Sequence, residues 1–245
     1  MSTAVNQNAT SAVDAKRSHL IDWLWPARCL LCGERGAAGR DLCVDCADAL
    51  PWNRSACRRC AIPLPVPAAA CGVCLQRPPP LTETHAALVY GFPIDRLLPR
   101  LKFHADLACG RLLSQLMAEA FAALPRPDAL LSLPLHRARL RSRGYDQALE
   151  LARPLSRALG IPLVDGVLLR KRATAPQSRL DAAARRRNLR GAFTVRDCIV
   201  LPAHVVLVDD VMTTGATLVE SAKALRRAGV ARVDAWVCAR VPTRG

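Results

Sequence analysis

Residues 205–218 read VVLVDDVMTTGATL, and this stretch decides the fold of the chain. Its first four residues are apolar and predict a short buried strand, with Asp209 and Asp210 where that strand is expected to end. A small, hydroxyl-rich turn comes next at residues 213–217 and opens a helical pattern. A strand, a tight turn and a helix in this order are typical of an α/β fold with a parallel sheet, whose ligands bind at the carboxyl ends of the strands.

The turn after this strand has the composition of an anion-binding site. The first N–H groups of a helix have no partners within the helix, and the helix dipole places about half a positive charge there. Thr213, Thr214 and Thr217 add hydroxyl donors, and Gly215 allows the backbone to approach a phosphate closely. The carboxylates before the turn suit the vicinal hydroxyls of a phosphorylated sugar and can help to hold Mg2+.

Two other interpretations of this stretch compete with an anion site. A plain strand–turn–helix with a capping threonine is the simplest, but it requires neither two acids nor three threonines. A Walker loop fits poorly, because no lysine comes after the glycine.

The stretch 205–218 resembles the phosphoribosyl-pyrophosphate (PRPP) loop of type I phosphoribosyltransferases. The resemblance implies that Asp209 and Asp210 are the catalytic pair and bind the ribose hydroxyls, while the loop binds the 5-phosphate and Mg2+ accompanies PRPP. The substrate-binding loop that it implies consists of Val211, Met212, Thr213, Thr214, Gly215, Ala216 and Thr217.

Length and composition indicate a globular protein. The chain has 245 residues, of which 51% are hydrophobic, and can bury a substantial core. It has no run of 18 apolar residues, so we expect no transmembrane helix. The N-terminus lacks the apolar core of a secretory signal, which favours a cytoplasmic location. Residues 1–22 are expected to form a disordered tail, and the apolar segment at residues 20–26 either packs on the neighbouring part of the chain or touches a membrane peripherally.

The net charge of +15 is concentrated in one region. Residues 135–190 hold 14 basic and 4 acidic residues and therefore carry +10 of this charge. Such a cluster favours an anionic partner, for example pyrophosphate, a nucleotide or a nucleic-acid backbone. The alternative is a solvated basic surface that reflects an arginine-rich genome.

Eight of the 11 cysteines form four Cys-x-x-Cys knuckles that repeat every 14 residues. Two residues between cysteines let both thiolates reach one ion, and two knuckles complete a tetrahedral site, so the pattern predicts two structural Zn2+ sites. Disulfides would need an oxidising compartment, a thioredoxin-like motif would need one knuckle in a βαβ unit, and an iron–sulfur cluster is a further alternative. The expected ligands are Cys29, Cys32, Cys43, Cys46, Cys57, Cys60, Cys71 and Cys74.

The pairing of the knuckles has two solutions. Sequential pairing places the first two knuckles on one ion and the last two on the other, whereas interleaved pairing gives a cross-braced module. We favour the sequential arrangement because its loops are short and close at low entropic cost. The proline-rich segment at residues 77–80 then separates a double zinc-ribbon module, residues 23–80, from an α/β domain, residues 81–245.

Strands and helices are expected to alternate through residues 81–245. The hydrophobic pattern predicts strands at residues 85–90, 128–133, 161–169, 205–208 and 233–241. It predicts helices at residues 94–103, broken by Pro99, and at residues 110–123, 147–159 and 217–228. Residues 170–190 are basic and are expected to form a loop with a short helix. This alternation predicts a parallel sheet flanked by helices on both faces.

Taken together, these features resemble the ComF/ComFC family, phosphoribosyltransferase-like proteins with an N-terminal zinc module. Shared motifs are LKF at residues 101–103, SLPLH at residues 132–136, and RGYDQ at residues 143–147, which usually reads RGFNQ in the family. The resemblance also covers residues 170–193. It implies that Lys102, Arg143 and Arg172 bind substrate, with Lys102 and Arg172 near the pyrophosphate.

Two functions are suggested by these observations. The first is a PRPP-binding protein that transfers phosphoribosyl to an unidentified acceptor and releases pyrophosphate. The second is a DNA-uptake factor of natural transformation that binds single-stranded DNA or a helicase partner, with PRPP or a nucleotide as regulator. Because only 4% of the residues are aromatic, binding to DNA would depend on phosphates and hence on salt.

Overall fold

The computed structural model describes residues 27–37, 39–171, 189–196 and 199–242. The chain forms two compact units, Met1–Leu50 and Pro51–Gly245. In the first unit, the amide of Cys29 donates to the carbonyl of Glu34 at 2.7 Å, and Gly33 has a φ of +82°, so the first knuckle closes as a tight turn. Helix α2, Val44–Asp48, begins at the second knuckle.

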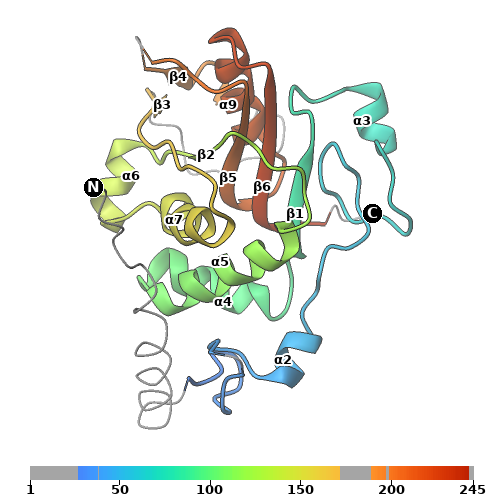
Figure 1. Cartoon of the computed structure of the whole chain (residues 1–245), viewed down its shortest axis with the longest axis vertical. Coiled ribbons are helices and arrows are strands. Elements are labelled where there is room, and N and C mark those ends of the chain that lie inside the picture. Colours follow the sequence, from blue (N-terminus) through green and yellow to red (C-terminus); the bar gives the residue numbers. More distant parts are fainter. Residues whose placement is uncertain (1–26, 38, 172–188, 197–198, 243–245) are drawn as a thin grey trace, which may run out of the picture. The chain divides into compact units, whose positions relative to one another are not determined.

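A four-stranded parallel sheet in the order β1-β6-β5-β2 forms the centre of the second unit (Figure 1). Residues on both faces of the two central strands are buried, as expected for a parallel sheet covered on both sides. A short antiparallel pair, β3 and β4, lies outside this sheet. The predicted α/β fold with a parallel sheet is confirmed. The strands are β1 (Thr84–Val89), β2 (Ala129–Ser132), β3 (Leu168–Arg170), β4 (Phe193–Val195), β5 (His204–Met212) and β6 (Arg232–Arg240).

Helices cover both faces of the sheet. Helix α5 packs on β1 and β6, α7 packs on β2, β5 and α5, and α9 packs on β6 and β4. The connection from β1 to β2 crosses the sheet in one direction and that from β5 to β6 in the other. Because connections between parallel strands are right-handed almost without exception, α9 is expected on the face opposite to α5, against which α7 packs. The helices of this unit are α3 (Gly72–Gln76), α4 (Ile94–Phe103), α5 (Leu107–Phe121), α6 (Arg137–Arg143), α7 (Gln147–Leu159) and α9 (Ala216–Arg227).

Capping side chains determine where these helices begin. Asp106 accepts a hydrogen bond from the amide of Cys109 at 3.1 Å, so α5 begins at Leu107 rather than at the predicted residue 110. Helix α7 has its predicted bounds, because Asp146 caps its start and Gly160, with a φ of +63°, ends it. Helix α4 is continuous through Pro99, so the predicted break is wrong.

The structure corrects three further predictions. Helix α6 was not expected, and it ends at Gly144, which has a φ of +80°. Residues 161–169 form no continuous strand: Leu163 makes one parallel bridge to Leu130, and β3 begins only at Leu168. Strand β5 does not end before the acid pair. It pairs with β2 only as far as Val208 but with β6 as far as Met212.

The apolar core of the second unit includes part of the cysteine-rich segment. Ala61, which is 1% exposed, belongs to the same cluster as Leu207 of β5 and Val237 of β6. This compact unit begins at Pro51, which lies inside the predicted zinc-ribbon module, residues 23–80. The predicted boundary after residue 80 stays a prediction. Among the described residues, no helix has the length and apolar character needed to cross a bilayer.

Candidate functional site

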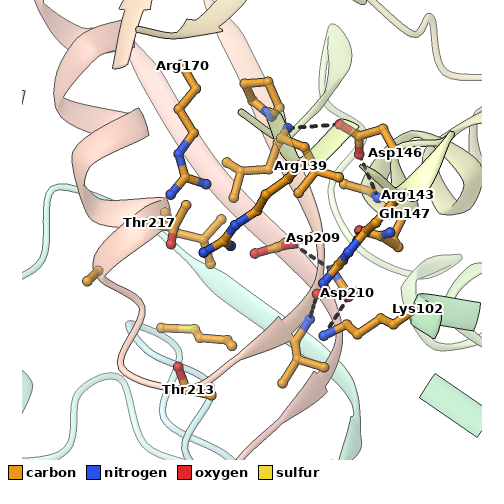
Figure 2. A pocket seen from close by; sticks show the side chains of 18 of the residues that line it. Lys102, Arg139, Arg143, Asp146, Gln147, Arg170, Asp209, Asp210, Thr213 and Thr217 are labelled. Atoms are coloured by element: carbon orange, nitrogen blue, oxygen red, sulfur yellow. Dashed lines mark hydrogen bonds and ion pairs between the residues drawn. The ribbon is translucent and has the colours of Figure 1, made fainter. Parts of the chain in front are cut away.

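A pocket of about 570 Å³ lies at the carboxyl ends of β2 and β5 (Figure 2). Segments far apart in the sequence meet there: the end of α4, the start of α7, helix α6, the end of β3 and the β5–α9 loop. The pocket forms at this edge because β5 continues beyond its last pair with β2, which leaves the far end of β5 open on that side. The polar and loop residues that line it are Lys102, Arg139, Ser142, Arg143, Asp146, Gln147, Arg170, Asp209, Asp210 and residues 211–217.

The two acids of β5 differ in how their oxygens are used. Asp210 is 8% exposed; one of its oxygens forms an ion pair with Lys102 Nζ at 2.8 Å, and the other accepts from the amide of Val211 at 2.6 Å. Asp209 accepts from the amide of Asp210 at 2.9 Å through Oδ1. Among the described residues, no hydrogen bond or ion pair is formed by Asp209 Oδ2. Asp209 therefore keeps one oxygen for a ligand.

Charges in the pocket shift the pKa values of this group. Burial and the neighbouring Asp210 carboxylate raise the pKa of Asp209 well above its usual range. For Lys102, burial lowers the pKa, but the attraction of Asp210 outweighs it, so the net pKa is raised and the ammonium stays charged. Two adjacent carboxylates at one site repel each other, and such an arrangement favours a bound cation or hydroxyl donors.

Three arginines, Arg139, Arg143 and Arg170, line the same pocket as the acids. In Figure 2 the side chain of Arg139 points toward Asp209 and that of Arg170 toward Thr217. Burial, followed by the charge of Arg139, lowers the pKa of Arg170 to about 10, and burial followed by the charge of Arg143 lowers the pKa of Arg139. Three arginines gathered in one pocket form a concentrated positive field, which suits a multiply charged anion.

The motif at residues 143–147 contributes Arg143, Asp146 and Gln147 to the pocket. Arg143 donates to Gln147 Oε1 at 2.8 Å, and its guanidinium lies 5.4 Å from the centroid of the Phe103 ring. Asp146 accepts from the amides of Leu135 at 2.9 Å and Ala148 at 3.0 Å through different oxygens. An asparagine here could not accept at both positions, because one of its terminal atoms is a nitrogen donor. Burial raises the pKa of Asp146, although these amides oppose the shift.

The loop between β5 and α9 presents unpaired amides to the pocket. Gly215 has a φ of +71° and forms the N-cap of α9, a conformation that L-residues rarely adopt. Within the part of the chain that the structure describes, the amides of Thr213 and Thr214 donate to no protein acceptor. The hydroxyl of Thr214 accepts from the amide of Ala216 at 3.4 Å. These amides lie just before the N-terminus of α9, at the place where the sequence predicts an anion-binding site.

The pocket brings together most of the predicted substrate residues. Lys102, Arg143, the acid pair and all of residues 211–217 line it. Arg172 lies outside the described residues, so its predicted role stays a prediction. Arg139 and Arg170 are site residues that were not predicted individually, although both belong to the basic cluster at residues 135–190.

The cysteines form two separate groups with the geometry of zinc ligands. Within each group the potential ligand atoms all lie within 4.8 Å of one another. Cys32 and Cys43 have sulfurs 3.6 Å apart, and Cys60 and Cys71 have sulfurs 3.8 Å apart. Tetrahedral Zn2+ with Zn–S bonds of about 2.3 Å separates its sulfurs by roughly 3.8 Å, so both groups fit. The grouping agrees with sequential pairing: Cys29, Cys32, Cys43 and Cys46 in one site, Cys57, Cys60, Cys71 and Cys74 in the other.

Comparison with known proteins agrees with both halves of this description. The sequence matches the double zinc ribbon domain over residues 20–84 and the phosphoribosyl transferase domain over residues 146–245. It is 39% identical to the DNA utilization protein YhgH of Salmonella typhi over 222 residues, covering 88% of this chain and 97% of the relative. The chain belongs to the ComF family. It thus combines two structural zinc sites with a phosphoribosyltransferase-like fold.

Other relatives within this family are similar over much of their length. The DNA utilization protein YhgH of Escherichia coli strain K12 is 36% identical, over 88% of this chain and 97% of the relative. Competence protein F of Haemophilus influenzae is 36% identical over 177 residues, which cover 69% of this chain and 77% of the relative. The pocket described above is therefore a feature of a ComF-family protein whose relatives are named for DNA use and competence.

Proposed function

We propose that the pocket binds PRPP together with Mg2+ and that the protein transfers the phosphoribosyl group to an acceptor with release of pyrophosphate. The observation that carries this proposal is the meeting of three elements in one pocket: the acid pair, the β5–α9 loop and the cluster of basic side chains. Each suits one part of PRPP, namely the ribose diol, the 5-phosphate and the pyrophosphate. A cytoplasmic location belongs to the same proposal.

The loop is the proposed site of the 5-phosphate. The amides of Thr213 and Thr214 are available to donate, and the N-terminus of α9 adds the positive end of a helix dipole. The hydroxyl groups of the loop threonines supply further donors. No lysine or arginine is needed at this end of the pocket.

The acid pair is the proposed partner of the ribose hydroxyls, and Asp209 is the principal acceptor because Asp210 is committed to Lys102 and Val211. Hydroxyl donors would replace the missing partners of Asp209 and favour its charged form. The same carboxylates would hold Mg2+, which supplies charge neutralisation to the leaving pyrophosphate. Carboxylates beside the ribose also stabilise the positive charge that develops on the sugar as the bond to pyrophosphate breaks.

The basic side chains are the proposed partners of the pyrophosphate. Lys102, Arg139, Arg143 and Arg170 all line the pocket. Burial and then repulsion by Arg143 lower the pKa of Arg139, and burial and then repulsion by Arg139 lower the pKa of Arg170. A bound anion reduces the repulsion between these positive charges, and this reduction favours the binding of pyrophosphate. The protein would thus act by electrostatic stabilisation and needs no nucleophile of its own.

Calorimetric titration of PRPP into the zinc-loaded protein, with and without Mg2+, tests this proposal. We expect Mg2+-dependent binding that is lost in Asp209→Asn/Asp210→Asn. The matched control is Asp45→Asn/Asp48→Asn, which removes two exposed acids from α2 and should leave binding unchanged. Absence of PRPP binding in folded, zinc-loaded protein would refute the proposal, as would equal binding by the two double variants.

A second candidate function is binding of single-stranded DNA. It is favoured by the exposed Arg137 and Arg141 on α6 beside the pocket and by the names of the relatives. Anisotropy of a labelled oligothymidine at several salt concentrations tests it. If both arginines contact phosphates, Arg137→Ala/Arg141→Ala should reduce the salt slope by about 1.4. Arg227→Ala on α9 is the exposed control. An unchanged salt slope in Arg137→Ala/Arg141→Ala would exclude α6 as the DNA contact. Binding of a helicase partner is a separate proposal, which this experiment does not address.

A further inference from the structure

Arg240 connects the second cysteine group to the loop of the pocket. It is the last residue of β6, is 6% exposed and pairs in register with Met212. Its Nε donates to the carbonyl of Cys60 at 2.9 Å. Its Nη1 donates to the carbonyls of Met212 at 3.1 Å and Thr213 at 2.7 Å. One buried guanidinium thus bonds both to a zinc knuckle and to the β5–α9 loop, all within the compact unit Pro51–Gly245.

These hydrogen bonds, together with one from the amide of Val241 to the carbonyl of Met212 at 3.0 Å, fix which way the loop amides face. In a trans peptide the C=O and N–H groups point in opposite directions. The carbonyls of Met212 and Thr213 point to Arg240, so the N–H groups of the same peptide planes, which belong to Thr213 and Thr214, point away from it. These are the amides without a protein acceptor among the described residues. Arg240 therefore holds from behind the donors that face the pocket.

The third knuckle, Cys57 and Cys60, is attached firmly enough to transmit a constraint. The carbonyl of Cys57 accepts from the amide of Ala61 at 2.8 Å, which closes the turn that contains the Cys60 carbonyl. Ala61 is buried in the core of the sheet, and the Asn53 side chain donates to its carbonyl at 2.9 Å. A zinc ion on this cysteine group would fix the Cys60 end of the connection, and the sheet fixes the other end.

We infer that Arg240 is a positioning residue for the 5-phosphate loop and that zinc at Cys57, Cys60, Cys71 and Cys74 holds Arg240 in place. Zinc at the second site then controls binding of the 5-phosphate by the loop, whereas zinc at the first site, in the other compact unit, does not. The ligand readout of this inference rests on the proposed function, because it uses the ribose phosphate site. A second readout, amide exchange of the loop, does not depend on any ligand.

The first experiment compares hydrogen exchange in peptides that cover residues 212–216. Variants are Arg240→Lys, which keeps the charge but loses the fork of donors, and Cys71→Ser/Cys74→Ser in the second cysteine group. Cys43→Ser/Cys46→Ser in the first group is the matched control, and metal analysis confirms one zinc lost in each cysteine variant. We expect faster exchange of the loop in the first two variants and wild-type exchange in the control.

The second experiment measures ribose 5-phosphate and Mg2+-pyrophosphate separately. In Arg240→Lys and Cys71→Ser/Cys74→Ser, affinity for ribose 5-phosphate should fall at least about tenfold, because charged hydrogen bonds that hold the loop are lost. Affinity for pyrophosphate should remain within about twofold, since the hydrogen bonds of Arg240 hold the loop and the Cys60 carbonyl rather than the basic side chains. Equal losses for both ligands would mean a general structural role and would overturn the inference.

The outcomes separate the inference from the proposed function. If wild-type protein binds no ribose phosphate but the loop still exchanges faster in the two variants, the proposed function fails and the connection through Arg240 stands. If wild-type protein binds PRPP and loop exchange is unchanged in both variants, the inference fails and the proposed function stands. Should Arg240→Lys not fold, the comparison between the two cysteine variants decides, because both retain Arg240.

Discussion

Replacing Lys102 by methionine tests whether the pocket contains a desolvated ion pair. Lys102 Nζ lies 2.8 Å from Asp210 Oδ2, with the two side chains 25% and 11% exposed. At an effective dielectric constant of about 20, unit charges at this distance attract by roughly 6 kcal/mol before desolvation is subtracted. Removal of one member of a buried pair costs about 3–5 kcal/mol, and the residual exposure of Lys102 favours the lower end, about 3 kcal/mol.

The assay is thermal and denaturant unfolding of Lys102→Met beside Lys223→Met. A loss of about 3 kcal/mol lowers Tm by roughly 6–12 °C in a protein of this size. Lys223 pairs with Glu220 at 2.7 Å, but its side chain is 47% exposed, so the control substitution should cost less than about 1 kcal/mol. The double variant Lys102→Met/Asp210→Asn should recover most of the loss, because no uncompensated charge remains.

Equal costs for the two lysine substitutions would refute this reasoning. They would mean that water reaches the Lys102–Asp210 pair as freely as a surface pair. Failure of Asp210→Asn to rescue Lys102→Met would likewise show that packing of the lysine stem, and not the unpaired carboxylate, causes the destabilisation.

Three further predictions concern the acid pair, the loop and the zinc sites. Asp209→Asn should abolish PRPP binding yet stabilise the fold at neutral pH. Because the folded state raises the pKa of Asp209, unfolding free energy falls as pH rises from the usual carboxyl range to the raised value, by about 1.4 kcal/mol for a difference of one in pKa. Unfolding curves between pH 4 and 8 that run parallel for variant and wild type would contradict this. Gly215→Ala should lower the free energy of unfolding by about 1 kcal/mol and weaken ribose 5-phosphate binding. The reasons are that Gly215 has a φ of +71° and that a Cβ there would clash with Met212 Cε. Gly91→Ala, where a Cβ would lie in open space, is the control for unfolding. Metal analysis should find two zinc ions per chain, and one in Cys43→Ser/Cys46→Ser.

Local sequence signals predicted the strand–turn–helix at residues 205–218 and the cysteine groups because each depends on residues close together in the chain. The proposed anion-binding loop needs only its own glycine, threonines and helix N-terminus. The knuckles need only two residues between cysteines, and short loops favour sequential pairing. Helix α7 was predicted to the residue, because Asp146 and Gly160 are strong caps.

Features that depend on partners elsewhere in the fold were missed. The length of β5 beyond Val208 comes from pairing with β6, which no local pattern of β5 reveals. Helix α6 has too few apolar residues to show a periodic apolar stripe, and its position depends on the other segments that surround the pocket. Arg170 enters the pocket because β3 ends there, and Arg240 reaches the loop only because β6 lies beside β5.

The buried position of Ala61 and the reach of Arg240 have a consequence for how such chains can recombine during evolution. Residues 51–80 share a core and hydrogen bonds with the sheet, so they are inherited with it as one piece. A recombination event between relatives would preserve these contacts only if its crossover point fell near Leu50. The first cysteine group is therefore the part that can be exchanged. The two zinc ribbons, alike in spacing, are thus expected to diverge at different rates.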